Sequence, residues 1–203
     1  MICFRFLIAN FEILLGSASP RRRELMAGLG LPFTAISIDA DESYPSDLKG
    51  GDIPYHISRA KARAYEGQLK ENQLLITADT IVWLDGRMLG KPHDTEEAKA
   101  MLRLLSGKTH QVYTAVTFAK KSIQCSVISL QTIVDQTDVT FRKLTEEEID
   151  YYVTHYRPFD KAGAYGVQEW IGYVACTGMN GSYFNVMGFP VHRVYEYLKS
   201  EHL

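Results

Sequence analysis

Residues 11–29 read FEILLGSASPRRRELMAGL, and this stretch predicts a strand that passes through a short turn into a helix. The apolar run at 11–16 is typical of a buried strand. Ser19 fits a helix cap and Pro20 fits the first helical position. The arginines at 21–23 then fall in the first helical turn, where the backbone is already partly positive. The stretch therefore predicts a strand–turn–helix unit whose helix begins under electrostatic strain.

An anion at this helix start would relieve that strain, because free backbone N–H groups and arginine side chains would both bind it. Successive helical positions point about 100° apart, so three consecutive arginines do not all face one ligand. Arg21 and Arg22, nearest the strand end, are the candidates. The alternative is a set of solvated arginines on an exposed turn. The motif is shorter than a P-loop and lacks its lysine, so it does not settle the question alone.

The rest of the chain alternates strands and helices, with some consecutive strands, which predicts a mixed α/β fold. Asp85-Gly86 predicts a hairpin turn and Asn180-Gly181 a second turn. Asp94 with Glu97, and Thr145 with Glu148, have the spacing of helix capping boxes. The predicted strands are 33–39, 111–119, 124–134 and a hairpin over 74–92; the predicted helices are 53–70, 94 to the residues before Gly107, 145 to Pro158, and the residues after Pro190.

The 203 residues fit a single domain, 1–203, in which 1–12 form an N-terminal extension. The formal charge of −2 argues against a general nucleic-acid binder. Three widely spaced cysteines indicate neither a disulfide framework nor a zinc site, and a cytoplasmic location fits them best. No run approaches the roughly 18 apolar residues of a membrane span, so we expect no membrane partner.

Asp79 lies in the run LLITADTIVW, where nearly all of its neighbours are apolar. A buried carboxylate must be paired, hydrogen-bonded, metal-bound or protonated. One interpretation is an aspartate that accepts backbone N–H groups at a strand irregularity. The other is a catalytic base or metal ligand. The segment alone favours neither.

Further candidates for phosphate or metal binding are two lysines and a group of carboxylates. Lys61 follows Ile57 by four residues and therefore lies on the apolar side of its helix, either reaching solvent or meeting a phosphate. Lys91 follows the predicted hairpin and alone carries little weight. Carboxylates at 39–42, including Glu42, gather where a strand ends; they are either a solvated loop or ligands for Mg²⁺ or Mn²⁺.

The stretch DKAGAYGVQ, residues 160–168, contains small residues and glycines that let a backbone approach a ligand. Asp160, Lys161 and Gln168 are its candidate polar contacts. A Gln side chain offers both a donor and an acceptor, which suits the edge of a nucleobase. The alternative is an ordinary glycine-containing turn. Together with the basic and acidic candidates, the stretch favours nucleotide phosphate chemistry.

Several motifs in this order resemble the Maf family of nucleoside triphosphate pyrophosphatases, over residues from about Ile13 to the C-terminal helix. The motifs that carry the resemblance are SASPRRRELMAGLG, SRAKARAY, TADTIV, GKP, LSGKTHQVYTAV, VTFRKLTEEEIDYYV, DKAGAYGVQ and NGSYFNVMGFPV.

The resemblance implies an α/β fold like that of the inosine triphosphate pyrophosphatases, with two lobes around a cleft, and a homodimer. It implies a nucleoside triphosphate diphosphatase that splits its substrate into a monophosphate and pyrophosphate with a divalent cation, Mg²⁺ or Mn²⁺. AYGVQ is similar to the branch that acts on dTTP and UTP rather than on 7-methyl-GTP, and modified pyrimidine nucleotides remain open as substrates.

By motif, Asp79 matches the catalytic acid/base of the family, and with Glu42 it is our candidate metal ligand. The residues that match positions of substrate choice or other pocket positions are Ser17, Arg21, Arg22, Glu42, Lys61, Thr80, Lys91 and Gln168. Lys161 completes our set of substrate-binding candidates. Two residues depart from the family pattern: Glu169 stands where a glycine commonly follows the glutamine, and Gly16 stands where alanine is usual.

Two other functions compete with this hypothesis. A nucleotide-binding regulator of cell division that does not hydrolyse its ligand would use the same pocket; Glu42, Lys61 and Asp79 together favour the enzyme. A module that binds RNA or DNA is opposed by the net charge and by the lack of a basic stripe rich in aromatic residues.

Overall fold

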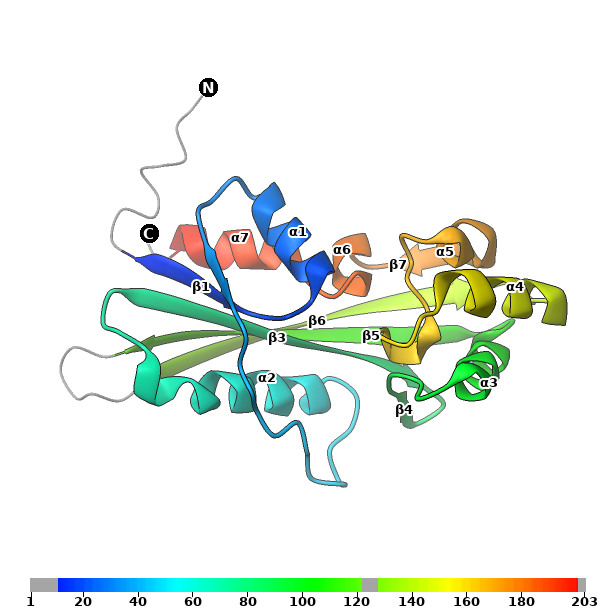
Figure 1. Cartoon of the computed structure of the whole chain (residues 1–203), viewed down its shortest axis with the longest axis horizontal. Helices are drawn as coiled ribbons and strands as arrows, with labels where there is room; N and C mark the ends of the chain where they lie inside the picture. The colour runs from blue at the N-terminus through cyan, green and yellow to red at the C-terminus, as the bar shows by residue number, and fades with distance from the viewer. Residues whose placement is uncertain (1–10, 122–127, 201–203) are drawn as a thin grey trace.

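The computed structural model describes residues 11–121 and 128–200, which fold around a seven-stranded sheet (Figure 1). The strand order is β2-β1-β3-β5-β6-β7, and β4 pairs with β3. β1 runs parallel to β2 and β3, and every other pair is antiparallel. The predicted mixed α/β class is confirmed. The strands are β1 (Glu12–Gly16), β2 (Thr34–Ile36), β3 (Gln73–Leu84), β4 (Arg87–Leu89), β5 (Thr109–Lys121), β6 (Ile128–Phe141) and β7 (Cys176–Asn180).

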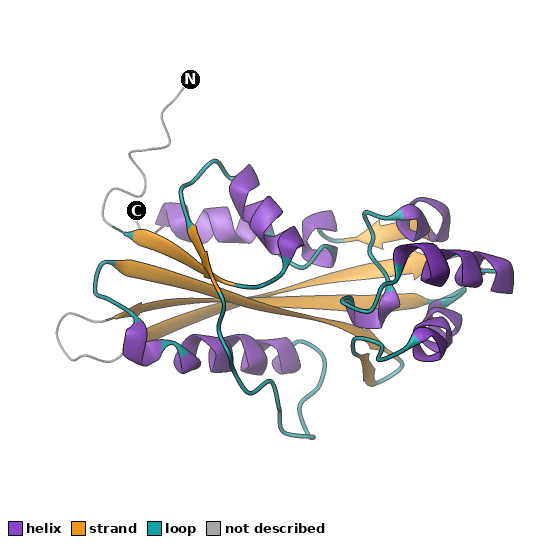
Figure 2. Cartoon of the chain, viewed as in Figure 1, coloured by secondary structure: helices purple, strands orange, loops and turns teal. Residues whose placement is uncertain are grey.

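Helices lie on both faces of the sheet (Figure 2). α2 covers one face, α1 and α7 lie on the other, and α3, α4 and α5 gather at the far end of the long strands. None of the helices in the described ranges is long and apolar enough to cross a bilayer. The helices are α1 (Pro20–Gly28), α2 (Asp52–Ala64), α3 (Thr95–Leu105), α4 (Glu146–Tyr156), α5 (Trp170–Ala175), α6 (Tyr183–Val186) and α7 (Val191–Ser200), with 3-10 turns η2 (Glu66–Gln68) and η3 (Ala162–Ala164).

Local sequence chemistry explains two of the helix starts. Thr145 and Glu148 form both hydrogen bonds of a capping box at α4. Asp94 accepts the backbone N–H of Glu97 at 2.8 Å, while the Glu97 carboxylate accepts that of His93 at 2.7 Å. Both predicted caps are therefore in place, and the second one reaches back one residue further than a capping box does.

The predicted hairpin turn at Asp85-Gly86 is confirmed, but at the second predicted turn Asn180 ends β7 and the chain only bends at Gly181; some element bounds also differ. Asp85 and Gly86 have φ of 49° and 81°, which is the conformation of a tight hairpin turn. The helix predicted over 53–70 ends at Ala64, because the chain tightens into η2 around Gly67. The strand predicted over 33–39 keeps hydrogen-bonded pairing only over β2. Within the predicted extension 1–12, residues 1–10 lie outside the described part, as do residues 124–127 of a predicted strand.

Two large apolar clusters lie along the same face of β3 and leave a break between them. Leu74, Ile76 and Ala78 pack with residues of α1 and α7. Val82 and Leu84 pack with residues of α3 and α4. Side chains on a strand alternate between faces, so position 80 occupies the break on this face and position 79 points to the α2 side. The sequence places threonine and aspartate at these two positions.

The edge of β3 is open at the same place. β1 pairs with β3 only as far as Gly16 opposite Thr77, and β4 begins its pairing opposite Val82. The segment 78–81 thus has no strand partner on this edge within the part of the chain that the structure describes. The chain after β1 turns into α1 here, at the carboxyl end of a parallel strand, which is where α/β folds commonly bind ligands.

Candidate functional site

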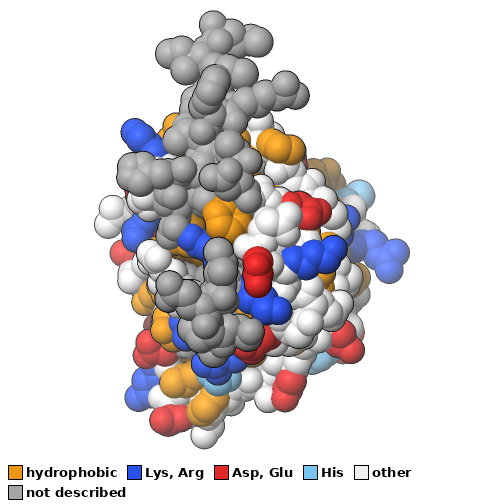
Figure 3. All heavy atoms as spheres, turned by 90° about the vertical axis from the view of Figure 1, so that its left-hand side faces the viewer, with side chains coloured by type: hydrophobic (Ala, Val, Ile, Leu, Met, Phe, Trp, Pro, Cys, Tyr) orange, Lys and Arg blue, Asp and Glu red, His pale blue; other side chains and the backbone are white. Residues whose placement is uncertain are grey.

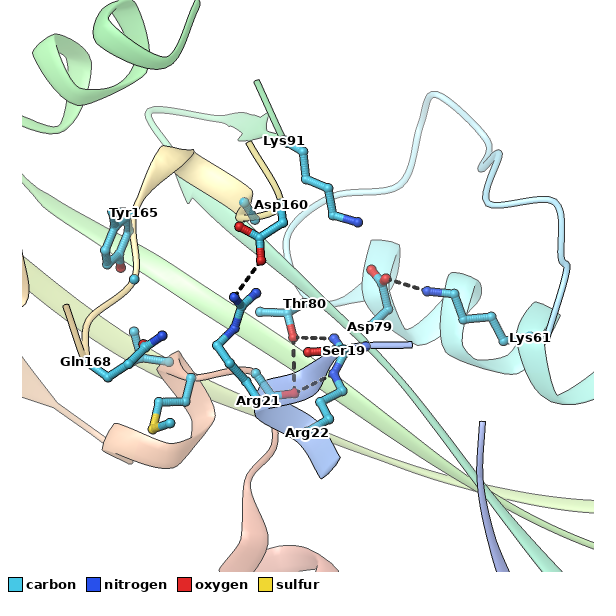
Figure 4. Close-up of a pocket in the computed structure, with 15 residues that line it drawn as sticks. Ser19, Arg21, Arg22, Lys61, Asp79, Thr80, Lys91, Asp160, Tyr165 and Gln168 are labelled. Atoms are coloured by element: carbon cyan, nitrogen blue, oxygen red, sulfur yellow. Dashed lines mark hydrogen bonds and ion pairs between the residues drawn. The ribbon is translucent and has the colours of Figure 1, made fainter. Parts of the chain in front are cut away.

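A pocket opens at this break in the sheet and receives side chains from α1, α2, β3 and the loops after β4 and α4 (Figure 4). It consists of two adjoining cavities of about 120 Å³ and 290 Å³. Gln168 and Tyr165 line one end of the pocket, and Lys61 with Asp79 lines the other (Figure 4). The residues that line both cavities are Ser19, Arg21, Arg22, Lys61, Lys91 and Asp160.

Arg22 closes the open edge of β3. Its Nη1 donates to the carbonyl of Ala78 at 2.9 Å, its Nη2 to the hydroxyl of Thr80 at 2.9 Å, and its Nε to the carbonyl of Gly188 at 2.8 Å. Burial lowers the pKa of Arg22, and the nearby Asp79 opposes that shift; an arginine stays charged regardless. The guanidinium has five N–H groups, so two remain for a ligand.

Arg21 faces the pocket from the first turn of α1. Its Nη1 donates to Oδ2 of Asp160 at 2.8 Å, across 139 residues of sequence. Arg23 instead points away, is exposed, and donates to the carbonyl of Ser17 at 3.2 Å. Arg21 and Arg22 therefore line the pocket and Arg23 does not, while their contact with one ligand stays a prediction. Ser17 lines the second cavity, and its Oγ accepts the backbone N–H of Ser19 at 3.2 Å.

Asp79 is a largely buried carboxylate with a cationic partner. Lys61 Nζ lies 2.9 Å from Oδ1 of Asp79 and 3.0 Å from Oε1 of Glu42. The side chains of Lys61 and Asp79 are 13% and 12% exposed. Lys61 thus extends from the apolar side of α2 into the pocket instead of reaching solvent. Of the two interpretations of Asp79, the pairing with Lys61 in a cavity favours the functional one.

The rest of the predicted acidic group does not reach the pocket. Asp41 accepts hydrogen bonds from the backbone N–H and the hydroxyl of Ser43 at 2.8 and 2.9 Å, and these bonds lower its pKa. Asp39 is exposed. Of the three, Glu42 alone lines the pocket and contacts Lys61, although its side chain is 55% exposed.

The donor set fits a hard divalent cation. One ammonium contacts both Glu42 and Asp79, so their carboxylates converge on a single point. The described residues offer no cluster of three or more His, Cys, Asp or Glu side chains. Mg²⁺ commonly takes one or two carboxylates and completes its shell with substrate phosphates and water, so two are sufficient.

Lys91 is exposed and lines both cavities. Within the described ranges it has neither a hydrogen bond nor an ion pair, unlike Arg21 and Lys61. Its ammonium is therefore available to an anion without breaking an existing contact. The pocket combines four positive side chains with the carboxylates of Glu42, Asp79 and Asp160, so a polyanion entering it meets preformed positive charge.

The loop 160–168 supplies the other end of the pocket. Gly163 has φ of 67°, and a Cβ there would lie 2.9 Å from Cγ2 of Val82, so the loop needs glycine to pack against β3. The side-chain oxygen of Gln168 is buried and has no hydrogen-bond partner among the described residues. An amide with an unmet acceptor at the pocket wall suits the edge of a base.

Lys161 differs from the other predicted substrate contacts. It is buried and lies behind Asp160, where Nζ is 2.7 Å from Oδ1 of Asp160 and 3.0 Å from Oε1 of Glu169. It does not line the cavities described above, so direct contact with substrate stays a prediction. The structure also locates the two residues that depart from the family pattern. A Cβ at Gly16 would lie 2.5 Å from Cδ1 of Ile38, and the Glu169 side chain points to Lys161 inside the protein.

Residue-by-residue reasoning missed part of the lining. Tyr165, Val186, Met187 and Gly188 line the cavity near Gln168. Gly188 has φ of 101°, and its carbonyl accepts a hydrogen bond from Arg22. The available signal was the motif NGSYFNVMGFPV, which carried part of the family resemblance without an assigned role.

The fold and the site together define a class: an α/β protein with a cationic pocket at a helix start, facing a pair of acidic side chains. More particularly, the chain belongs to the Maf family, since the model of Maf-like proteins matches residues 12–201. A dTTP/UTP pyrophosphatase of Bacteroides thetaiotaomicron is 53% identical over 94% of this chain and 96% of its own length. Its counterparts in Phocaeicola vulgatus and Porphyromonas gingivalis are 49% and 48% identical, each over 95% of this chain and 97% and 95% of their own lengths.

Among solved structures, the Ham1 protein of Staphylococcus aureus aligns with a TM-score of 0.44 and 13% identity, over 64% of this chain and 71% of its own. Similarity at this level carries no argument about the site.

Proposed function

We propose that this protein hydrolyses dTTP and UTP to the nucleoside monophosphate and pyrophosphate. The observation that carries the proposal is the convergence of Arg21, Arg22, Lys61 and Lys91 on one pocket that contains Asp79. The near full-length similarity to dTTP/UTP pyrophosphatases supports the same reaction. Canonical and modified pyrimidine nucleotides share the phosphate chain that these groups bind.

In the proposed reaction, water attacks the α-phosphorus, the bond from that phosphorus to the α–β bridging oxygen breaks, and pyrophosphate leaves. Asp79 accepts the proton of the attacking water. Arg22 and Lys91 neutralise charge that develops on the phosphate oxygens, which is commonly the largest catalytic contribution. Arg21 contacts the phosphate chain equally in the bound substrate and in the transition state. The backbone N–H groups at the start of α1 add to this stabilisation and orient the phosphate chain of the substrate.

We propose that Glu42 and Asp79 hold a divalent cation, Mg²⁺ or Mn²⁺, which would supply Lewis-acid stabilisation of the phosphates. Lys61 now occupies the space between these carboxylates and would contact a phosphate oxygen when the cation binds. Removal of divalent cations with EDTA should abolish turnover, and Mg²⁺ or Mn²⁺ should restore it. Full activity after chelation would contradict this assignment.

Asp79 and Gln168 line opposite ends of the pocket, and this suggests how the nucleotide lies. If the phosphates lie at the end of the pocket that Asp79 lines, the base would reach Gln168. The amide of Gln168 can donate to one polar atom of a pyrimidine edge and accept from another. Thr80 and Arg21 lie between the two ends (Figure 4), where they would contact the sugar and the α-phosphate.

A nucleotide panel tests the proposal. Purified protein with Mg²⁺ and added inorganic pyrophosphatase is incubated with each canonical nucleoside triphosphate, and released phosphate is measured by malachite green. We expect dTTP and UTP to be the best substrates. Nucleotide binding without hydrolysis of any member would instead favour a binding regulator of cell division.

Assembly and location belong to the same proposal. We propose a homodimer in the cytoplasm with no nucleic-acid partner. Among the described residues that Figure 3 leaves uncovered, positive and negative side chains are interspersed, whereas nucleic-acid binding commonly uses a basic patch or stripe. Light scattering of the purified chain would measure its mass in solution, and a monomer would contradict the dimer.

A further inference from the structure

Glu169 follows Gln168 in the sequence, but its side chain turns away from the pocket. Its Oε2 accepts a hydrogen bond from the hydroxyl of Tyr152, and its Oε1 lies 3.0 Å from Nζ of Lys161. The Tyr152 hydroxyl in turn accepts the backbone N–H of Gly166 at 3.0 Å. A Cβ at Gly166 would lie 2.9 Å from Cδ of Glu169, so the glycine leaves room for the carboxylate. Helix α4, the loop and Lys161 thus hold Glu169 in one position.

The contacts continue from Glu169 to the pocket. Lys161 Nζ lies 2.7 Å from Oδ1 of Asp160, and the other oxygen of Asp160 accepts from Arg21 at 2.8 Å. Lys161 is only 7% exposed, and a buried ammonium requires charged partners. Burial raises the pKa of Asp160, but hydrogen bonds from Lys161 and Arg21 outweigh it and hold the pKa below its ordinary value. Four side chains of alternating charge, Glu169, Lys161, Asp160 and Arg21, therefore connect the interior to the pocket.

We propose that Glu169 is a positioning residue for phosphate binding by Arg21. It acts at a distance, through Lys161 and Asp160. Two carboxylates and one ammonium behind Arg21 fix the place of Asp160, and Asp160 fixes the guanidinium. A pre-organised donor loses less conformational entropy when it binds. The inference rests on the proposed function, since it takes the triphosphate as the ligand of Arg21.

The same network keeps Asp160 from opposing the substrate. When phosphate oxygens bind the remaining N–H groups of Arg21, the Asp160 carboxylate lies beside a polyanion. Lys161, held by Glu169, continues to neutralise it. Without the charge of Glu169, the Lys161–Asp160 pair loses its anchor in the interior, and Arg21 loses its fixed orientation. The expected effect is on binding rather than on the chemical step.

The test is Glu169→Gln, which keeps the shape and can still accept a hydrogen bond from Lys161. We expect the KM for UTP, and the Kd of inorganic tripolyphosphate measured by calorimetry, to rise roughly 3- to 10-fold. kcat should stay within about twofold, because the weakened contact stabilises the bound substrate and the transition state equally. The matched control is Glu146→Gln, which removes an exposed ion pair between Glu146 of α4 and Arg103 of α3 and should change none of the three values.

A second background separates positioning from general destabilisation. In Arg21→Ala protein, Glu169→Gln should weaken tripolyphosphate binding no further, because the guanidinium that the network positions is absent. An equal loss in both backgrounds, an unchanged Kd in the single variant, or no tripolyphosphate binding by the wild type would overturn the inference. Binding needs no turnover, so a wild type that binds but hydrolyses no nucleotide would contradict the proposed function alone.

Discussion

Asp79 faces Lys61 across 2.9 Å in a pocket lined by cations, and the proposed mechanism gives it the proton of the attacking water. Asn has nearly the same shape but accepts no proton at neutral pH. Asp79→Asn should therefore bind UTP yet lower kcat by about 10²- to 10⁴-fold. Steady-state turnover and calorimetric binding measure the two effects separately.

The control for this variant is Asp150→Asn, which removes another carboxylate paired to a lysine, Lys99 at 2.7 Å, away from the pocket. It should keep wild-type turnover. Near-normal turnover in Asp79→Asn would remove Asp79 from the proposed role.

Gln168 tests the other end of the pocket. Its side-chain oxygen lacks a partner among the described residues, so a base edge would satisfy it. Gln168→Ala should reduce the differences in kcat/KM among nucleoside triphosphates by about tenfold, the value of a hydrogen bond or two. Inhibition by inorganic pyrophosphate should be unchanged, since this residue lies away from the phosphates. An unaltered nucleotide profile would contradict the assignment.

At the scale of elements, α5 must start directly behind Gln168, and Gly172 makes this possible. A Cβ at Gly172 would lie 1.8 Å from the carbonyl oxygen of Val167. Gly172→Ala should therefore push the backbone before Gln168 out of place, lower the free energy of unfolding by several kcal/mol, about 3 or more, and disturb base selection. Denaturant unfolding and the nucleotide panel measure both effects.

Gly28, the last residue of α1, provides the matched control. A Cβ there meets nothing within 4 Å, so Gly28→Ala should leave stability unchanged or raise it by about 0.5–1 kcal/mol. Equal losses in the two variants would show that close packing behind Gln168 is not the cause.

At the scale of the whole molecule, His110 couples folding to pH. Its ring is buried, and its Nε2 shares a hydrogen bond of 2.8 Å with the hydroxyl of Tyr165. Burial lowers the pKa of His110 from 6.5 to about 4. Between these pH values the unfolded chain binds a proton at this position and the folded chain does not. Stability is therefore lost as pH falls, by at most about 3 kcal/mol at pH 4.

His110→Gln removes the titrating group and should flatten the pH dependence of the unfolding free energy between pH 6.5 and 4. Denaturant titrations across this range measure the slope. His155→Gln, at an exposed histidine of α4, should leave the slope as in the wild type. An unchanged slope in His110→Gln would place the pH dependence elsewhere.

Much of this architecture is present in short stretches of sequence. The structure confirms three features that depend on neighbours within four residues: the capping box at Thr145, the turn at Asp85-Gly86, and the helix start at Pro20 with arginines in its first turn. Asp79 stood out for a similar reason, since one carboxylate in an apolar run needs a partner wherever the strand lies.

Which partner each side chain meets was decided only by the tertiary structure. Arg21 finds Asp160 across 139 residues, and Lys161 turns behind that carboxylate toward Glu169. The open edge at 78–81 arises because β1 stops and β4 starts at particular registers on β3. Periodicity reports which face of an element is buried, but not what packs against it. The sequence alone therefore determined the elements and the candidate residues, while long-range packing decided which of them share one pocket.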